Sequence, residues 1–170
     1  MARVKIGKFQ NLLLAKENLP TLSHAVRTAL AAVASLLVTR LLRLPEPYWA
    51  AISSLIAMQS TLGAALTVSV QRAVGTAIGA AVGALAATWF SGNALVFGIA
   101  VFLIGLHCVT LRVDRSAYRY ASIALAIVML IARPENPWIV AFHRFVEVSL
   151  GVAVALALTA AWPERRATPR

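Results

Sequence analysis

The sequence contains little charge, and negative charge is the scarcest. Only 13% of its 170 residues are Asp, Glu, Lys or Arg, and only six of them are acidic. A soluble domain carries about 25% charged residues, because its surface must face water. A chain that is 60% hydrophobic, with a mean hydropathy of +0.79, cannot cover such a surface. The composition therefore predicts an integral membrane protein.

Cysteine and clustered carboxylates are scarce as well. The single cysteine, Cys108, rules out a disulfide within the chain. The acidic residues are scattered singly, without a Ser/His/Asp triad or a multi-carboxylate cluster. His143 and Glu147 stand one helical turn apart, but no third ligand is near, which argues against zinc. We therefore expect no metal, no cofactor and no enzymatic activity.

Long hydrophobic runs are plentiful. Six of them approach the roughly 20 helical residues that cross a bilayer core, and helices are required because lipid cannot satisfy free backbone groups. Within a transmembrane domain of residues 23–163, we predict spans at 25–42, 49–66, 73–90, 94–111, 117–132 and 138–162. Four tryptophans fall near predicted span ends, where indole prefers the membrane interface: Trp49, Trp89, Trp138 and Trp162.

Basic residues exceed acidic ones by ten. In a soluble chain this excess would suggest nucleic acid, but here the basic residues cluster between apolar runs, where they attract anionic lipid. With the N-terminus inside, the outer side carries only Arg40, Arg43, Arg133 and Arg144. The positive-inside rule thus predicts that both termini are cytoplasmic. Membrane lipid is the expected partner of the basic residues, and nucleic acid is not.

Both ends of the chain are basic. Residues 1–22 would form either an amphipathic helix on the inner leaflet or a frayed leader, and Thr21 or Ser23 would cap the first span. Residues 164–170 are expected to form a cytoplasmic tail.

An internal repeat is suggested by QRAVGTAIGAAVG at 71–83 and HRFVEVSLGVAVA at 143–155. Arg72 matches Arg144 and Gly79 matches Gly151 at the same spacing. Three spans per unit is an odd number, so the second copy would enter the membrane from the opposite side. Inverted repeats of this kind place binding sites near the midplane, where the copies meet.

Four glycines favour close helix packing. Gly75, Gly79 and Gly83 form two overlapping GxxxG units, and Gly151 corresponds to Gly79 in the second copy. In lipid, small residues on one helix face allow backbones to approach closely.

Two candidate ligand-binding residues lie in the first half. Arg72 stands at the N-terminal end of the predicted 73–90 span, where free N–H groups and a guanidinium would together hold a carboxylate; a snorkelling interface arginine is the alternative. Gln59 lies midway through the predicted 49–66 span and either lines a water-filled cavity or bonds a neighbouring helix.

Arg144 and Glu147 lie inside the sixth predicted span, where a charge costs about 2.5–3.5 kcal/mol at the bilayer centre on insertion scales. Three interpretations stay open. The two form an ion pair within the helix, or Arg144 holds an anionic substrate while Glu147 partners another helix or carries a proton, or Arg144 snorkels to the outer interface.

The order of these motifs is similar to that of a known family. Pro47-Tyr48-Trp49-Ala50 leads through an apolar run to Gln59 and Gly63, and then to Arg72, Gly75 and Thr76. This order resembles the fusaric acid resistance-like (FUSC) membrane module of the aromatic acid exporter family, over roughly residues 20–163. Plant aluminium-activated malate transporters have a related organisation.

The resemblance implies a six-helix bundle of inverted repeats, in a bacterial inner membrane, that pairs with a second copy. It implies export of organic anions, above all aromatic carboxylic acids, by a homodimer or a hetero-oligomer. Arg72 and Arg144 would bind carboxylate, while Glu147 and Gln59 would shape the cavity. An anion channel and a non-transporting scaffold subunit are the alternatives.

Overall fold

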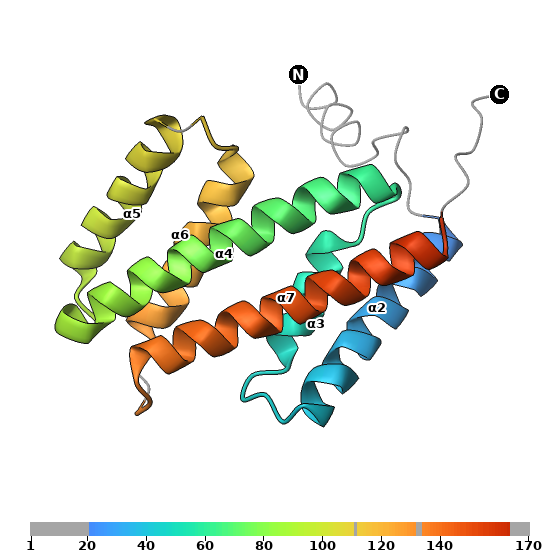
Figure 1. Ribbon diagram of the computed structural model, residues 1–170, viewed down its shortest axis with the longest axis horizontal. Coiled ribbons are helices and arrows are strands. Elements are labelled where there is room, and N and C mark those ends of the chain that lie inside the picture. Colours follow the sequence, from blue (N-terminus) through green and yellow to red (C-terminus); the bar gives the residue numbers. More distant parts are fainter. Residues whose placement is uncertain (1–20, 111, 132–133, 164–170) are drawn as a thin grey trace, which may run out of the picture.

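The computed structural model describes residues 21–110, 112–131 and 134–163, and these residues are helical with no strand. The helices are α2 (Leu22–Leu41), α3 (Tyr48–Ala57), α4 (Leu62–Phe90), α5 (Ala94–Thr110), α6 (Arg115–Leu130) and α7 (Pro137–Ala161) (Figure 1). The prediction of an all-α fold is confirmed. Residues 1–20 and the predicted tail 164–170 lie outside the described residues, whereas Thr21 caps α2 by accepting a hydrogen bond from the His24 backbone N–H.

In the part of the chain that the structure describes, three helices are long and apolar enough to cross a membrane: α2, α4 and α7. The other three are shorter, with 10 residues in α3, 17 in α5 and 16 in α6. At about 1.5 Å per residue, α3 rises only about 15 Å, half of a core of about 30 Å. Membrane-spanning length is therefore met by three of the six predicted spans.

The second and third predicted spans have the wrong boundaries. Helix α3 ends at Ala57 and α4 begins at Leu62, so the predicted 49–66 span is interrupted and the 73–90 span starts earlier. The backbone of Met58 is extended, with φ −67° and ψ 115°. Thr61 then caps α4, because its side chain accepts the Ala64 backbone N–H at 3.3 Å. Hydropathy averages over such a break and does not locate it.

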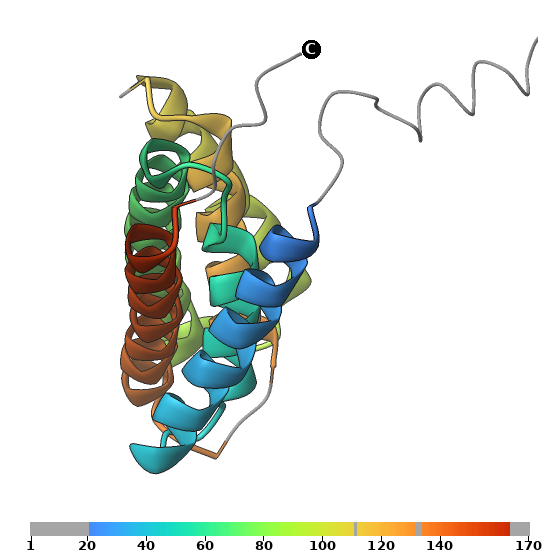
Figure 2. The same ribbon diagram turned by 90° about the vertical axis from the view of Figure 1, so that its right-hand side faces the viewer.

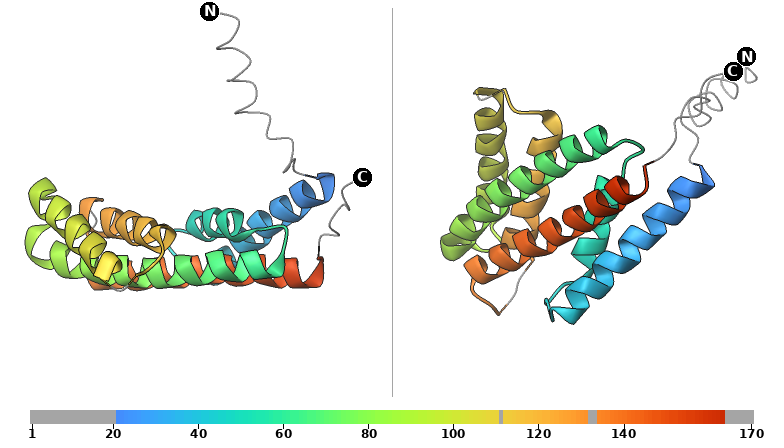
Figure 3. Two further views of the ribbon diagram at one scale, coloured as in Figure 1. Left: turned by 90° about the horizontal axis from the view of Figure 1, so that it is seen from above. Right: turned by 45° about the vertical axis from the view of Figure 1, so that its right-hand side comes forward.

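The six described helices form two layers. Helices α4 and α7 lie side by side in one layer, and α3 and α6 pack on the same face of that pair, flanked by α2 and α5 (Figures 2 and 3). Helix α2 begins at the end of the bundle where α7 finishes (Figure 1).

The long helices α4 and α7 each pack mainly against helices from the other half of the chain. Helix α4 packs chiefly against α6 and α7 and has little contact with α3, whereas α7 packs against α3 and α2 and has little contact with α6. An inverted repeat would give this exchange, and that repeat stays a prediction.

The four glycines lie where helices cross. A Cβ at Gly75 would lie 2.5 Å from the carbonyl oxygen of Ala117 in α6, and one at Gly83 would lie 3.1 Å from Leu125 Cα. A Cβ at Gly79 would collide with the carbonyl group of Ala121 in α6. A Cβ at Gly151 would likewise collide with the carbonyl group of Ala50 in α3. Only glycine permits α4 to approach α6, and α7 to approach α3, at these distances.

Candidate functional site

Two buried arginines from different helices face one small cavity. Arg72 of α4 is 5% exposed and Arg144 of α7 is 2% exposed. Both line a cavity of about 10 Å³, which has room for about one water molecule. Two aromatic residues from the short helices, Trp49 of α3 and Tyr120 of α6, line it as well, together with Thr76 of α4. Arg72 and Arg144, predicted separately, are thus brought together.

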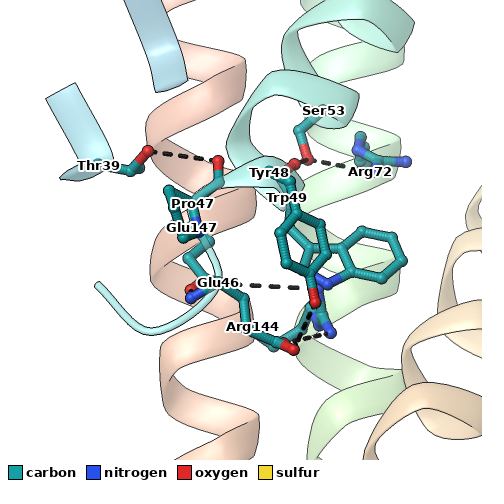
Figure 4. Close-up of polar contacts among 9 residues, drawn as sticks. All are labelled: Thr39, Glu46, Pro47, Tyr48, Trp49, Ser53, Arg72, Arg144 and Glu147. Atoms are coloured by element: carbon teal, nitrogen blue, oxygen red, sulfur yellow. Dashed lines mark hydrogen bonds and ion pairs between the residues drawn. The ribbon is translucent and has the colours of Figure 1, made fainter. Parts of the chain in front are cut away.

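Arg144 is held by a carboxylate and by an aromatic face. Its Nη2 donates to Glu46 Oε2 at 3.0 Å, and its Cζ lies 3.9 Å from the centroid of the Trp49 ring (Figure 4). The Glu147 carboxylate is further away, with 4.0 Å between its Oε2 and Arg144 Nη1. The closer of these two counter-ions therefore comes from the loop between α2 and α3.

Glu147 also forms a hydrogen bond to the backbone of Glu46, in addition to its contact with Arg144. Its Oε1 accepts the backbone N–H of Glu46 at 2.8 Å, and the side chain is buried. The Tyr48 hydroxyl donates to Glu46 Oε1 at 2.6 Å (Figure 4). Glu147 and Tyr48 together fix the position of the Glu46 carboxylate against Arg144.

Arg72 has a different set of neighbours. Its Nη2 donates to Ser53 Oγ at 3.1 Å (Figure 4). Its Cζ lies 5.1 Å from the centroid of the Tyr120 ring. Among the described residues, the ion pairs involve Arg144 and leave Arg72 without a carboxylate. A buried charge of this kind is costly unless an anion compensates it.

The helix position predicted for Arg72 is wrong, and the cavity role predicted for Gln59 stays a prediction. Arg72 lies in the interior of α4 rather than at a helix N-terminus, so free N–H groups do not assist it. Gln59 is absent from the wall of the cavity and lies in the break between α3 and α4. There its backbone oxygen accepts from Arg27 Nη2 at 3.4 Å, and its side-chain Nε2 donates to Ile56 O at 3.3 Å.

The sequence reasoning missed four residues of the site: Glu46, Trp49, Ser53 and Tyr120. Glu46 lies between the predicted 25–42 and 49–66 spans and has no predicted role, and Trp49 is predicted only as a residue of the membrane interface. One signal was available, because Tyr48 and Tyr120 are separated by the same spacing as Arg72 and Arg144. The matching spacing would pair one tyrosine with each arginine. Tyr120 does lie against Arg72, but the ring that lies against Arg144 belongs to Trp49, the residue after Tyr48.

A larger pocket of about 560 Å³ opens beside the arginine cavity, and we call it the loop pocket. Its wall consists of Arg43, Pro45, Glu46, Pro134, Glu135, Ile139, Val140 and His143. Glu46 belongs to this wall and also accepts a hydrogen bond from Arg144, which lines the arginine cavity. In the described part of the chain, no three His, Cys, Asp or Glu side chains lie close enough to hold a metal ion.

Membrane-length apolar helices and two arginines around an internal cavity define a helical membrane protein with a cationic site in its interior. The chain belongs to the fusaric acid resistance protein-like family, whose sequence model matches residues 30–158. This match confirms the family resemblance and includes both arginines. The family is one of membrane transport and resistance proteins. No curated protein matches the chain.

Proposed function

We propose that this protein carries organic anions, chiefly aromatic carboxylates, outward across a bacterial inner membrane. One observation carries the proposal: Arg72 is buried without a carboxylate among the described residues, beside a second arginine and two aromatic rings. A guanidinium binds a carboxylate through two parallel hydrogen bonds. The neighbouring rings match an aromatic substrate, because offset or edge-to-face ring pairs are favourable.

The cavity supports a carrier rather than an open pore. A volume of about 10 Å³ has room for about one water molecule, so an aromatic acid cannot enter until helices move apart. Alternating access by movement of one group of helices against another is the usual behaviour of secondary transporters. An anion channel with the same arginines is the second candidate. Saturation and counter-transport would favour the carrier, whereas a steady chloride current would favour the channel.

A homodimer is part of the proposal. Exposed alanines of α4 and α7 offer a second copy small side chains to pack against: Ala77, Ala81, Ala153 and Ala157. Small residues on such faces are typical of helix contacts in membranes. Light scattering of the detergent-solubilised protein would measure its mass and test this part directly.

Replacing Arg72 with alanine is expected to reduce transport strongly. Flux of labelled para-hydroxybenzoate in proteoliposomes should fall about tenfold or more, because charge-assisted bonds to the carboxylate are lost. Arg72→Lys should retain part of the flux, since the charge remains but the bidentate geometry does not.

Arg40→Ala is the matched control for Arg72→Ala, because Arg40 is exposed in the last turn of α2 and takes no part in the cavity. Its flux should equal that of the wild type. An Arg72→Ala protein that folds and transports at the wild-type rate would rule out the proposed role of Arg72.

A further inference from the structure

We propose that Ser53 is a positioning residue of the anion site: its hydroxyl holds the Arg72 guanidinium in the cavity wall and leaves the positive charge available to the substrate carboxylate. This role rests on the proposed function and adds to the anion site a residue that carries no charge of its own.

The Ser53 hydroxyl forms two hydrogen bonds of opposite sense. It donates to the backbone oxygen of Trp49 at 2.6 Å and accepts from Arg72 Nη2 at 3.1 Å. A hydroxyl has one hydrogen and two lone pairs, so the bond to Trp49 uses its hydrogen and leaves only acceptor positions for Arg72. Ser53 is 0% exposed, so bulk water does not compete for these positions. The backbone of α3 thereby fixes the direction in which Ser53 receives the guanidinium.

Arg72 is held from two sides by uncharged side chains. Ser53 of α3 accepts from its Nη2, and the Tyr120 ring of α6 lies 5.1 Å from its Cζ. Helices α3 and α4 have little other contact, and among the described residues the bond to Ser53 is the one side-chain hydrogen bond that joins them. A long arginine side chain has many rotamers, so loss of this bond would release the guanidinium from its position.

Ser53 uses only a small part of the bonding capacity of Arg72. A guanidinium has five N–H donors in a fixed fork, and Ser53 accepts from one nitrogen of that fork. In the described part of the chain, Arg72 Nε is buried without a hydrogen-bond partner. A carboxylate binds an arginine through two parallel hydrogen bonds. Arg72 therefore keeps free donors for a substrate carboxylate while Ser53 holds it in place.

A neutral partner matters because a charged one would take the place of the substrate. Next to Arg144, the Glu46 carboxylate accepts from Nη2 at 3.0 Å. A carboxylate at the position of Ser53 would bind Arg72 in the same way and compete with the transported anion. Serine orients the cation without cancelling its charge.

The neighbouring Ser54 provides a matched control. It belongs to the same helix and is also 0% exposed. Its Oγ lies 3.1 Å from Ser35 Oγ in α2 and donates to the backbone oxygen of Ala51 at 2.8 Å. Ser54 is therefore a buried hydroxyl of α3 that contacts α2 instead of Arg72.

The test measures the affinity for para-hydroxybenzoate in two ways. One is the KM of uptake into proteoliposomes, and the other is the concentration that raises the melting temperature of the detergent-solubilised protein. Ser53→Ala should raise both about tenfold, because a bond to a charged group is lost, and should leave the maximal uptake rate within about twofold. Ser53→Thr retains the hydroxyl and should stay within about threefold of the wild type. Ser54→Ala should match the wild type in both measurements.

A substitution by aspartate tests why the residue is neutral. Ser53→Asp supplies Arg72 with a tethered carboxylate, so uptake at a substrate concentration below the wild-type KM should fall about tenfold or more. The protein should still melt at a higher temperature than Ser54→Asp, whose new charge lies beside Ser35 instead of an arginine.

The outcomes separate this role from the proposed function. A wild-type KM in Ser53→Ala, an equal rise of KM in Ser54→Ala, or wild-type uptake in Ser53→Asp would overturn the role of Ser53 and leave Arg72 as the anion site. A folded Ser53→Thr with the affinity of Ser53→Ala would overturn it as well. A wild-type protein that binds para-hydroxybenzoate but does not move it would overturn transport alone. A wild-type protein that does neither would overturn both.

Discussion

Replacement of Gly79 with alanine is expected to destabilise the bundle by about 1–3 kcal/mol or more, the usual cost of overpacking. The added Cβ would collide with the carbonyl group of Ala121, which is backbone and cannot rotate away. Helix α4 would have to move from α6, and the cavity wall contributed by Tyr120 would move with it. Gly151→Ala should have a similar effect, because its Cβ would collide with the carbonyl group of Ala50 in α3.

Gly98→Ala provides the control in α5, since a Cβ there meets nothing within 4 Å. Alanine is the better helix former by about 1 kcal/mol, so this variant should be as stable as the wild type or slightly more stable. Thermal unfolding of the detergent-solubilised proteins measures all three. Equal melting temperatures for Gly79→Ala and Gly98→Ala would show that α4 does not approach α6 this closely.

Arg144→Leu should destabilise the protein by about 3–5 kcal/mol at neutral pH, as expected when one partner is removed from a buried ionic group. The substitution removes the cation between Glu46 and Glu147 and leaves their like charges facing one another. The free energy of unfolding of the detergent-solubilised variant measures this loss.

A second substitution tests the cause of that loss. Glu147→Gln removes a charge but keeps an oxygen that can accept the Glu46 backbone N–H. Added to Arg144→Leu, it should restore part of the stability, and the double-mutant cycle then measures the coupling between the two positions. An Arg144→Leu protein that unfolds at the wild-type temperature at neutral pH would contradict this account.

The positions of most helices could be predicted from the sequence, because apolar runs and turn residues are local signals. The turn at Ser91-Gly92-Asn93 is such a case, and Gly92 has the positive φ of 73° that glycine adopts readily. The break after Ala57 was harder to predict. Its polar residues, Gln59, Ser60 and Thr61, were visible in the sequence, but the same residues also suit a cavity wall or an interhelical bond.

The partners of the arginines could not be predicted from local spacing. Glu147 lies three residues from Arg144 and was the obvious counter-ion, yet Glu46, 98 residues away, lies closer to the guanidinium. That pairing depends on the packing of α3 against α7, which places Ala50 near the start of α3 against Gly151 in the middle of α7. The pattern of one helix carries no information about which loop will face it.

The exchange of partners between the halves has a consequence for biosynthesis. When α4 leaves the ribosome, α6 and α7, the helices against which it mainly packs, have not been made. Helices α2, α3 and α4 are therefore made before the part of α6 that contacts Gly75, Gly79 and Gly83. The packing of α4 against α6 can form only later in synthesis. The cavity between Arg72 and Arg144 can form only after α7, which carries Arg144, has been synthesised.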